Sequence, residues 1–198
     1  MREVQPPAIA RRLLLALPVQ LINVGKVEAV QTAYENLEYR GGRLYWSQAS
    51  AAASIGRAGI KTDKREGDGA TPAGTYPLVS VLYRADRISR PASCLPVSPL
   101  EPNHGWVDDP GDANYNRLVS LPYAAGTEKM WRQDRLYDAL VVIGYNMQPV
   151  IPRFGSAIFL HIARADFSST QGCIAVKKEI LLGLLPLLGP GSTITIRV

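Results

Sequence analysis

The apolar residues of the chain fall mainly in short runs that are separated by glycine and proline. Run 75–83 alternates with β-branched and aromatic residues, whereas run 138–145 is apolar almost throughout. Such runs are typical of strands, and the 17 glycines and 15 prolines supply turns between them. The expected strands are residues 21–24, 27–34, 43–47, 49–55, 75–83, 138–145, 157–162 and 194–198. The pattern therefore predicts a mainly β fold with a few short helices, arranged as a sandwich or a barrel.

Two segments have the periodicity of a helix. Residues 127–135 are expected to form one helix, with Thr127 as its N-cap. Residues 178–188 place apolar side chains three and four positions apart, which gives the segment one apolar face. Pro186 lies inside it and is expected to end or bend the helix. We expect this second helix to serve core packing.

Two long polar stretches, 56–75 and 101–121, separate the apolar runs. Long loops in a compact domain often carry function, and we interpret both stretches as such loops. Their individual glycines and prolines are explained by ordinary turn chemistry.

The N-terminal segment has its own character. Arg11 and Arg12 precede the apolar stretch 13–19, and this order resembles the charged and apolar parts of an export signal. We therefore divide the chain into residues 1–35, an N-terminal extension or export segment leading into the first strands, and residues 36–198, the main domain. No apolar run reaches the ~18 residues of a membrane span, so no stable span is predicted.

Composition narrows the class of partner. Hydrophobic residues make up 46% and charged residues 20% of the 198, which argues against wholesale disorder and fibrous repeats. The net charge of +5 favours an anionic partner. The basic residues form no dense stripe of the kind that binds nucleic acid, so we expect no nucleic-acid partner. An anionic polymer such as cell wall fits the charge.

The two cysteines, Cys94 and Cys173, are too few for a disulfide scaffold or a four-ligand zinc site. Cys94 is interpreted as structural or incidental. The alternative is a disulfide bond between the two cysteines, which would leave Cys173 without a reactive thiol.

The strongest chemical feature is the pair His161 and Cys173, which eleven residues separate. His161 follows an apolar run and is expected at a strand end; the loop after it can fold back and place the thiol beside the imidazole. A cysteine nucleophile needs such a neighbour to take its proton, and we expect a thiol pKa below the ~8.5 of free cysteine. Gly172 allows close backbone approach, and the amides of Gly172 and Cys173 are candidates for an oxyanion hole. The side chain of Ile162 cannot orient the imidazole, whereas a backbone carbonyl can.

The alternative reading is that Cys173 is a small core residue and His161 a hydrogen-bonded structural one. Further candidates for substrate contact share polar or aromatic character and lie in the long loops or between the histidine and the cysteine. These candidates are His104, Trp106, Tyr115, Asn116, Arg117, Arg164, Thr170 and Gln171.

Several segments together resemble the L,D-transpeptidase catalytic domain, also called the YkuD domain. Residues 169–174, Ser-Thr-Gln-Gly-Cys-Ile, are similar to its Ser/Thr-x-Gly-Cys-hydrophobic signature, and residues 71–77 to its Thr-Pro-x-Gly-x-aromatic-Pro segment. Residues 64–69, 105–110 and 114–117 resemble one bacterial branch of the family. The resemblance spans roughly residues 43–198, with all segments in the family's order.

The resemblance implies a mixed β-sandwich or open barrel and an enzyme of peptidoglycan metabolism. Cys173 would attack the bond between a diamino acid and a terminal D-Ala, and His161 would act as base. An amine of a second stem peptide would resolve the thioester into a cross-link, a step of cell wall biogenesis and cell shape maintenance. No metal or cofactor is implied, and the expected location is the periplasm or cell envelope. The alternatives are an L,D-carboxypeptidase, with water as acceptor, and a non-catalytic module that binds cell wall.

Overall fold

The structure is a computed structural model that describes Met1 and residues 34–198. The export-like segment and the expected strand at 21–24 lie outside the described residues, as does all but the last residue of the expected strand at 27–34. Residues 34–198 belong to one compact unit, Ala33–Val198.

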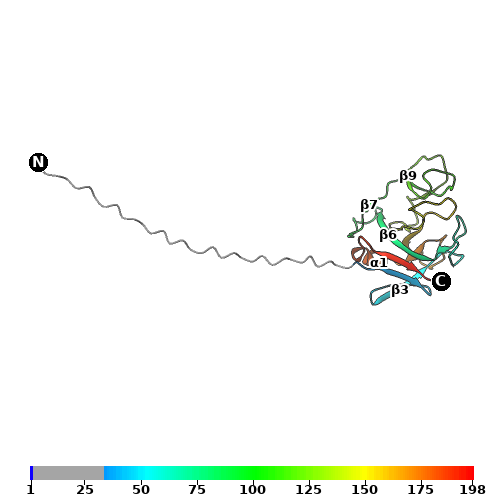
Figure 1. The fold of residues 1–198 in the computed structure, drawn as a ribbon, viewed down its shortest axis with the longest axis horizontal. Helices are drawn as coiled ribbons and strands as arrows, with labels where there is room; N and C mark the ends of the chain where they lie inside the picture. Colours follow the sequence, from blue (N-terminus) through cyan, green and yellow to red (C-terminus); the bar gives the residue numbers. More distant parts are fainter. Residues whose placement is uncertain (2–33) are drawn as a thin grey trace. The chain divides into compact units, whose positions relative to one another are not determined.

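A nine-stranded sheet forms the body of this unit (Figure 1). Its strands follow the order β11-β12-β13-β3-β2-β1-β14-β6-β7, and the sheet closes on itself because β11 also pairs with β6. The mainly β fold expected from the sequence is thus confirmed, in a closed, barrel-like form. The strands are β1 (Leu37–Arg40), β2 (Arg43–Trp46), β3 (Ala49–Ser54), β6 (Gly74–Tyr83), β7 (Val97–Pro99), β11 (Ala139–Ile143), β12 (Phe159–Ile162), β13 (Ile174–Val176) and β14 (Thr193–Ile196).

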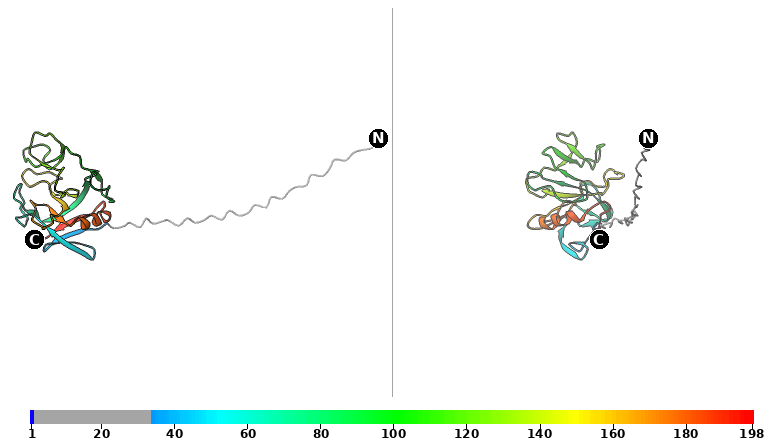
Figure 2. Two further views of the ribbon diagram at one scale, coloured as in Figure 1. Left: turned by 180° about the vertical axis from the view of Figure 1, so that it is seen from behind. Right: turned by 90° about the vertical axis from the view of Figure 1, so that its left-hand side faces the viewer.

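Two small sheets complete the domain. One contains β8 (His104–Val107), β9 (Leu118–Ser120) and β10 (Thr127–Lys129) in the order β10-β8-β9, and the other pairs β4 (Ile60–Lys61) with β5 (Thr71–Pro72). Both views of Figure 2 place the green segment that contains β8 and β9 at the end of the domain opposite the blue-to-cyan hairpin β2–β3.

The prediction of a helix at residues 127–135 is wrong. Residues Thr127–Lys129 form β10, which pairs antiparallel with β8, and turns follow up to Tyr137. Pairing to a distant segment outweighs the helical periodicity of so short a stretch, because a helix this short is marginal without tertiary support. The stretch 101–121 is likewise only partly a loop, since β8 and β9 lie in it.

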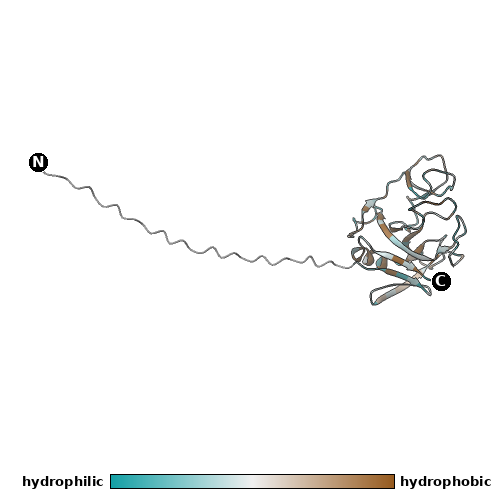
Figure 3. Cartoon of the chain, in the orientation of Figure 1, coloured by the Kyte–Doolittle hydropathy of each residue, from teal (hydrophilic) through white to brown (hydrophobic). Residues whose placement is uncertain are grey.

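The central strands are buried on both faces, which explains why they are apolar throughout. On β12, Leu160 and Ile162 face the larger hydrophobic cluster, whereas Phe159 faces a second cluster that also holds Trp106 and Cys173. Figure 3 shows hydrophobic residues concentrated in the strands and in α1. The second cluster marks the face on which the functional candidates gather.

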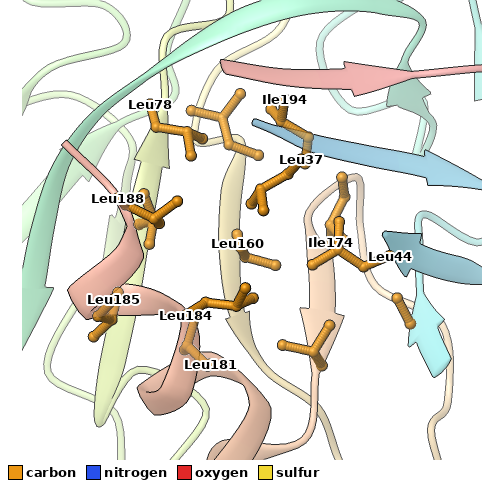
Figure 4. Packing of buried hydrophobic residues seen from close by; sticks show 14 of the residues in the cluster. Leu37, Leu44, Leu78, Leu160, Ile174, Leu181, Leu184, Leu185, Leu188 and Ile194 are labelled. Carbon is orange, nitrogen blue, oxygen red and sulfur yellow. The ribbon is translucent and has the colours of Figure 1, made fainter. Parts of the chain in front are cut away.

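Helix α1 (Lys178–Leu184) covers the larger cluster and runs into a 3-10 turn, Leu185–Leu187. Figure 4 shows side chains of this segment pointing toward the same interior as those of the strands. Pro186 lies in the 3-10 turn and ends the α-helix, as expected from the sequence. The residues labelled on this segment are Leu181, Leu184, Leu185 and Leu188.

Candidate active site

The structure brings His161 and Cys173 onto one face of the sheet. β12 and β13 are parallel neighbours with His161 opposite Ala175, so Cys173, two positions before Ala175, shares the face of His161. The loop between the strands has folded back, as the spacing predicted. Both side chains line one cavity of about 370 Å³.

Cys173 is held by the backbone just before and within β12. Its Sγ donates to the carbonyl oxygen of Ala157 at 3.2 Å and accepts from the amide of Phe159 at 3.4 Å. Only 7% of the residue is exposed. Burial, together with the carboxylate of Glu128, raises the pKa of the thiol to about 12, although the Phe159 amide opposes the shift. The lowered thiol pKa expected from the sequence is therefore wrong.

His161 is buried beside the ring of Tyr137, whose centroid lies 5.3 Å from that of the imidazole. Burial lowers the pKa of His161 to about 4, so the ring is neutral near pH 7. Its Nδ1 lies 2.8 Å from the carbonyl oxygen of Ile162. Because a carbonyl only accepts, we assign the proton to Nδ1, which leaves Nε2 free to act as a base.

The turn before Cys173 is braced by hydroxyl groups. Thr170 Oγ1 donates to the carbonyl of Cys173 at 2.6 Å and accepts from the amide of Gly172 at 3.1 Å. Thr71 Oγ1 donates to the carbonyl of Gly172 at 2.8 Å. Gly172 has φ of +142°, and a Cβ there would lie 2.8 Å from the carbonyl oxygen of Ala70, so glycine is required. The Gly172 amide, a candidate oxyanion donor from the sequence, is bonded to Thr170 in this state.

A comparison with models of protein families matches residues 25–196 to the L,D-transpeptidase catalytic domain (YkuD). The chain belongs to this family. A search of curated proteins finds no match. Members of the YkuD family are in general cysteine L,D-transpeptidases that act on peptidoglycan.

Three of the predicted substrate contacts line the cavity of this L,D-transpeptidase domain: Arg164, Thr170 and Gln171. Arg164 is exposed at the cavity, and Gln171 Oε1 accepts a hydrogen bond from Arg57. Whether these side chains contact substrate stays a prediction.

The other five predicted contacts lie outside the cavity lining that the described residues form. His104 Nδ1 accepts from the amide of Glu101 at 3.1 Å and closes a turn, and Arg117 is exposed. Trp106, Tyr115 and Asn116 are buried, and they connect loops that surround the site. Their contacts are taken up again below.

Sequence reasoning missed several charged and aromatic residues of the cavity. Tyr137 donates to Glu128 Oε1 at 2.5 Å, and burial raises the pKa of that carboxyl. Arg132 lies 3.7 Å from the same Glu128. All three residues lie in or just after segment 127–135, which was predicted to be a helix, and this wrong prediction is why they were not identified as site residues. Lys64 lines another part of the wall and pairs with Asp68 at 2.8 Å.

Cys94 is exposed and Cys173 is buried, and both are free thiols. The alternative of a bridge between them is thus wrong, and Cys173 remains available for chemistry. Within the described residues, no group of three or more His, Cys, Asp or Glu side chains is placed to hold a metal ion. The same part of the chain contains no helix long and apolar enough to cross a membrane.

Proposed function

We propose that the protein is a peptidoglycan L,D-transpeptidase in which Cys173 is the nucleophile and His161 the general base. One observation carries the proposal. The thiol and the imidazole share one face of two neighbouring parallel strands and line the same cavity, in a chain of the YkuD family. A pure binding module needs neither a buried thiol nor a histidine with a free Nε2.

The first half-reaction starts from a neutral pair, because the thiol pKa is raised and the imidazole pKa is lowered. Nε2 of His161 takes the thiol proton while the sulfur attacks the carbonyl carbon between the diamino acid and the terminal D-Ala. The carbon–nitrogen bond then breaks, and the imidazolium returns the proton to the leaving amine of D-Ala. A thioester on Cys173 remains. The Nδ1 contact with the Ile162 carbonyl orients the ring and stabilises its charged form.

The amide of Cys173 is the proposed oxyanion donor. One such donor is worth about 3 kcal/mol of transition-state stabilisation in a serine protease. The Gly172 amide is bonded to Thr170 in this state, so it takes part only if the turn shifts when substrate binds.

In the second half-reaction an amine of another stem peptide attacks the thioester. A new amide bond forms, the carbon–sulfur bond breaks, and the amine's proton passes to His161 and then to the sulfur. Water as the acceptor gives a tripeptide instead, which is the L,D-carboxypeptidase alternative.

Three cationic side chains, Lys64, Arg132 and Arg164, line the cavity together with three acidic ones, Glu66, Asp108 and Glu128. Lys64 pairs with Asp68 and Arg132 with Asp134. Arg164 is the exposed one of the three cations and is proposed to meet a substrate carboxylate. Because peptidoglycan is built outside the cytoplasmic membrane, we propose that the protein works in the periplasm or cell envelope.

The test is mass spectrometry of the purified protein after incubation with a disaccharide-tetrapeptide. We expect a cross-linked dimer that has lost one D-Ala, no product from Cys173→Ala, and full product from the matched control Cys94→Ala. Tripeptide alone would move the assignment to a carboxypeptidase. A dimer made by Cys173→Ala would overturn the role of the thiol.

A further inference from the structure

The thiol of Cys173 is held by a short segment, residues 155–159, which precedes and enters β12. The carbonyl of Ala157 accepts the S–H proton, and the amide of Phe159 donates to the sulfur. A thiol has one proton, so it cannot donate to His161 while it donates to Ala157. The position of the Ala157 carbonyl therefore determines the direction in which the S–H of Cys173 points.

Ala157 has a backbone conformation that an alanine rarely adopts. Its φ is +54°, in the left-handed region, which is unfavourable for a residue with a Cβ. Such a conformation persists only where surrounding contacts determine it. The contact on the Ala157 amide is a 3.0 Å hydrogen bond to Oδ1 of Asn116.

Asn116 is fully engaged in four hydrogen bonds. Its Oδ1 also accepts from the indole of Trp106 at 2.9 Å, and its Nδ2 donates to the carbonyls of Tyr145 at 3.0 Å and Asn146 at 2.8 Å. Only 2% of the residue is exposed. With no remaining donor and no access to solvent, this side chain serves as a rigid support for the Ala157 amide.

A second anchor reaches the same segment from the opposite loop. Glu66 Oε2 accepts from Ser156 Oγ at 2.7 Å and from the hydroxyl of Tyr115. The oxygen of that hydroxyl accepts from the amide of Gly155 at 3.1 Å. The segment that holds the thiol is thus contacted, directly or through Asn116, by residues of the three segments 64–69, 105–110 and 114–117. These residues are Glu66, Trp106, Tyr115 and Asn116.

We propose that Asn116 is a positioning residue for the nucleophile. It holds Ala157 in the left-handed conformation, so that the Ala157 carbonyl accepts a hydrogen bond from the S–H of Cys173 until substrate breaks that hydrogen bond. The proposal rests on the role of Cys173 proposed above and adds a resting state to it. Activation then consists of turning the S–H from Ala157 toward Nε2 of His161.

The titratable side chains that line the cavity with the thiol are His161, Tyr137, Glu128, Lys64, Glu66, Asp108, Arg132 and Arg164. Glu128 disfavours the thiolate, whereas Tyr137 and Lys64 favour it. None of them is changed in the test below, so a shift in thiol behaviour there reports on the carbonyl.

The test uses Asn116→Gly in a Cys94→Ser background, which leaves Cys173 as the only thiol. Asn116 has φ of +59°, which glycine adopts without strain, so the variant removes the amide and keeps the backbone. Losing the acceptor carbonyl removes a bond that favours the protonated thiol. We expect iodoacetamide alkylation of Cys173 at pH 7.5 to rise about fivefold, while cross-linking falls at least about tenfold.

Trp106→Phe is the matched control. It deletes another hydrogen bond to the same Oδ1 but leaves the Ala157 contact in place. We expect its alkylation rate to stay within about twofold of the parent. If Asn116→Gly slows alkylation and cross-linking together, or if it behaves as Trp106→Phe does, Asn116 has only a structural role and the proposal is overturned.

A measurement on the Cys94→Ser protein itself covers the case in which Asn116→Gly does not fold. Its infrared spectrum at pH 7 is expected to show an S–H stretching band at lower frequency than the same protein in denaturant, because the thiol donates to a carbonyl. Absence of the band, or an unshifted band, would overturn the proposal. Failure of the proposed function shows separately, as cross-linking that survives Cys173→Ala.

Discussion

At the scale of single residues, burial decides the protonation of the candidate catalytic pair. The thiol of Cys173 and the imidazole of His161 each lose solvent, and each therefore favours its neutral form. Both shifts disfavour charge separation between the thiol and the imidazole.

The lowered pKa of His161 makes a stability prediction. The unfolded chain binds a proton at this residue below about pH 6.5, whereas the folded protein does so only below about 4. The stabilisation that the neutral His161 gives the folded protein is therefore complete above pH 6.5 and is lost as the pH falls toward 4. We expect wild type to lose about 3 kcal/mol more unfolding free energy than His161→Gln between pH 7 and pH 4.

Urea unfolding of both proteins at pH 7, 5.5 and 4 measures this difference. Other carboxylates titrate in the same range, but they are common to both proteins and cancel in the comparison. Parallel stability curves would show that the imidazole is not buried as the structure has it.

At the scale of elements, the site depends on how the turn before β13 is joined to the strands around it. Thr71 is completely buried at the start of β5, and its hydroxyl accepts from the amide of Gly56 at 2.9 Å while donating to Gly172. Thr170 adds backbone bonds to Ile55 and Arg57. The loop after β3 and the loop before β13 thus form one braced unit beneath the thiol.

Thr71→Val tests this brace. The substitution keeps the shape but leaves the Gly56 amide and the Gly172 carbonyl without their partner, which costs about 2 kcal/mol of unfolding free energy. Since Gly172 precedes Cys173, we also expect kcat for cross-linking to fall about tenfold. Thr71→Ser retains the hydroxyl and is the control; equal losses in both variants would assign the effect to the methyl group.

Helix α1 and its 3-10 extension make a packing prediction. Leu184 is 1% exposed and points into the larger cluster, whereas Leu187, three residues later, is 41% exposed. Leu184→Ala is expected to cost 2–5 kcal/mol, roughly, through lost burial and a cavity. Leu187→Ala should change the unfolding free energy by less than about 0.5 kcal/mol. Chemical denaturation measures both, and a similar loss in the two variants would contradict the orientation of this segment.

At the scale of the whole molecule, closure of the main sheet creates two faces with different tasks. The pairing of β11 with both β6 and β12 buries the larger cluster on one side of these strands. The other side receives β8 and β10 with their loops, and the cavity lies among them. The core supplies rigidity, and loops supply most of the cavity wall; among the described residues, Glu128 of β10 and His161 of β12 are the lining residues that lie in strands.

The net charge of +5 makes a prediction at this scale. Long-range attraction to an anionic polymer is screened by salt, so the fraction bound to purified cell-wall sacculi should fall severalfold between 50 and 500 mM NaCl. Sedimentation of the protein with sacculi measures this. Duplex DNA is the comparison: with no basic stripe, we expect weak binding, and tight binding with a steep dependence on salt would indicate a nucleic-acid partner instead.

The strands at 43–47, 49–55, 75–83, 138–145, 157–162 and 194–198 were predictable because their apolar runs match the period of a strand or the burial of a central one. β8 and β10 were missed, as were the short strands β1, β4, β5, β7, β9 and β13. The local sequence predicts a polar loop at His104–Val107 and the start of a helix at Thr127–Lys129. In the structure the two segments pair with each other as antiparallel strands. Such pairing depends on a distant partner, which no local window contains.

The sequence by itself determined the mainly β fold, the helix that ends just before Pro186, the family, and the candidate pair of His161 and Cys173. Each of these depends on residue type and local spacing. Only the tertiary structure decided that Trp106, Tyr115 and Asn116 support the site from within, and that Tyr137 and Glu128 line its cavity. It also reversed the expected pKa of the thiol. The physical reason is that burial, hydrogen-bond partners and electrostatic fields arise from contacts between distant parts of the chain, which exist only once the sheet has closed.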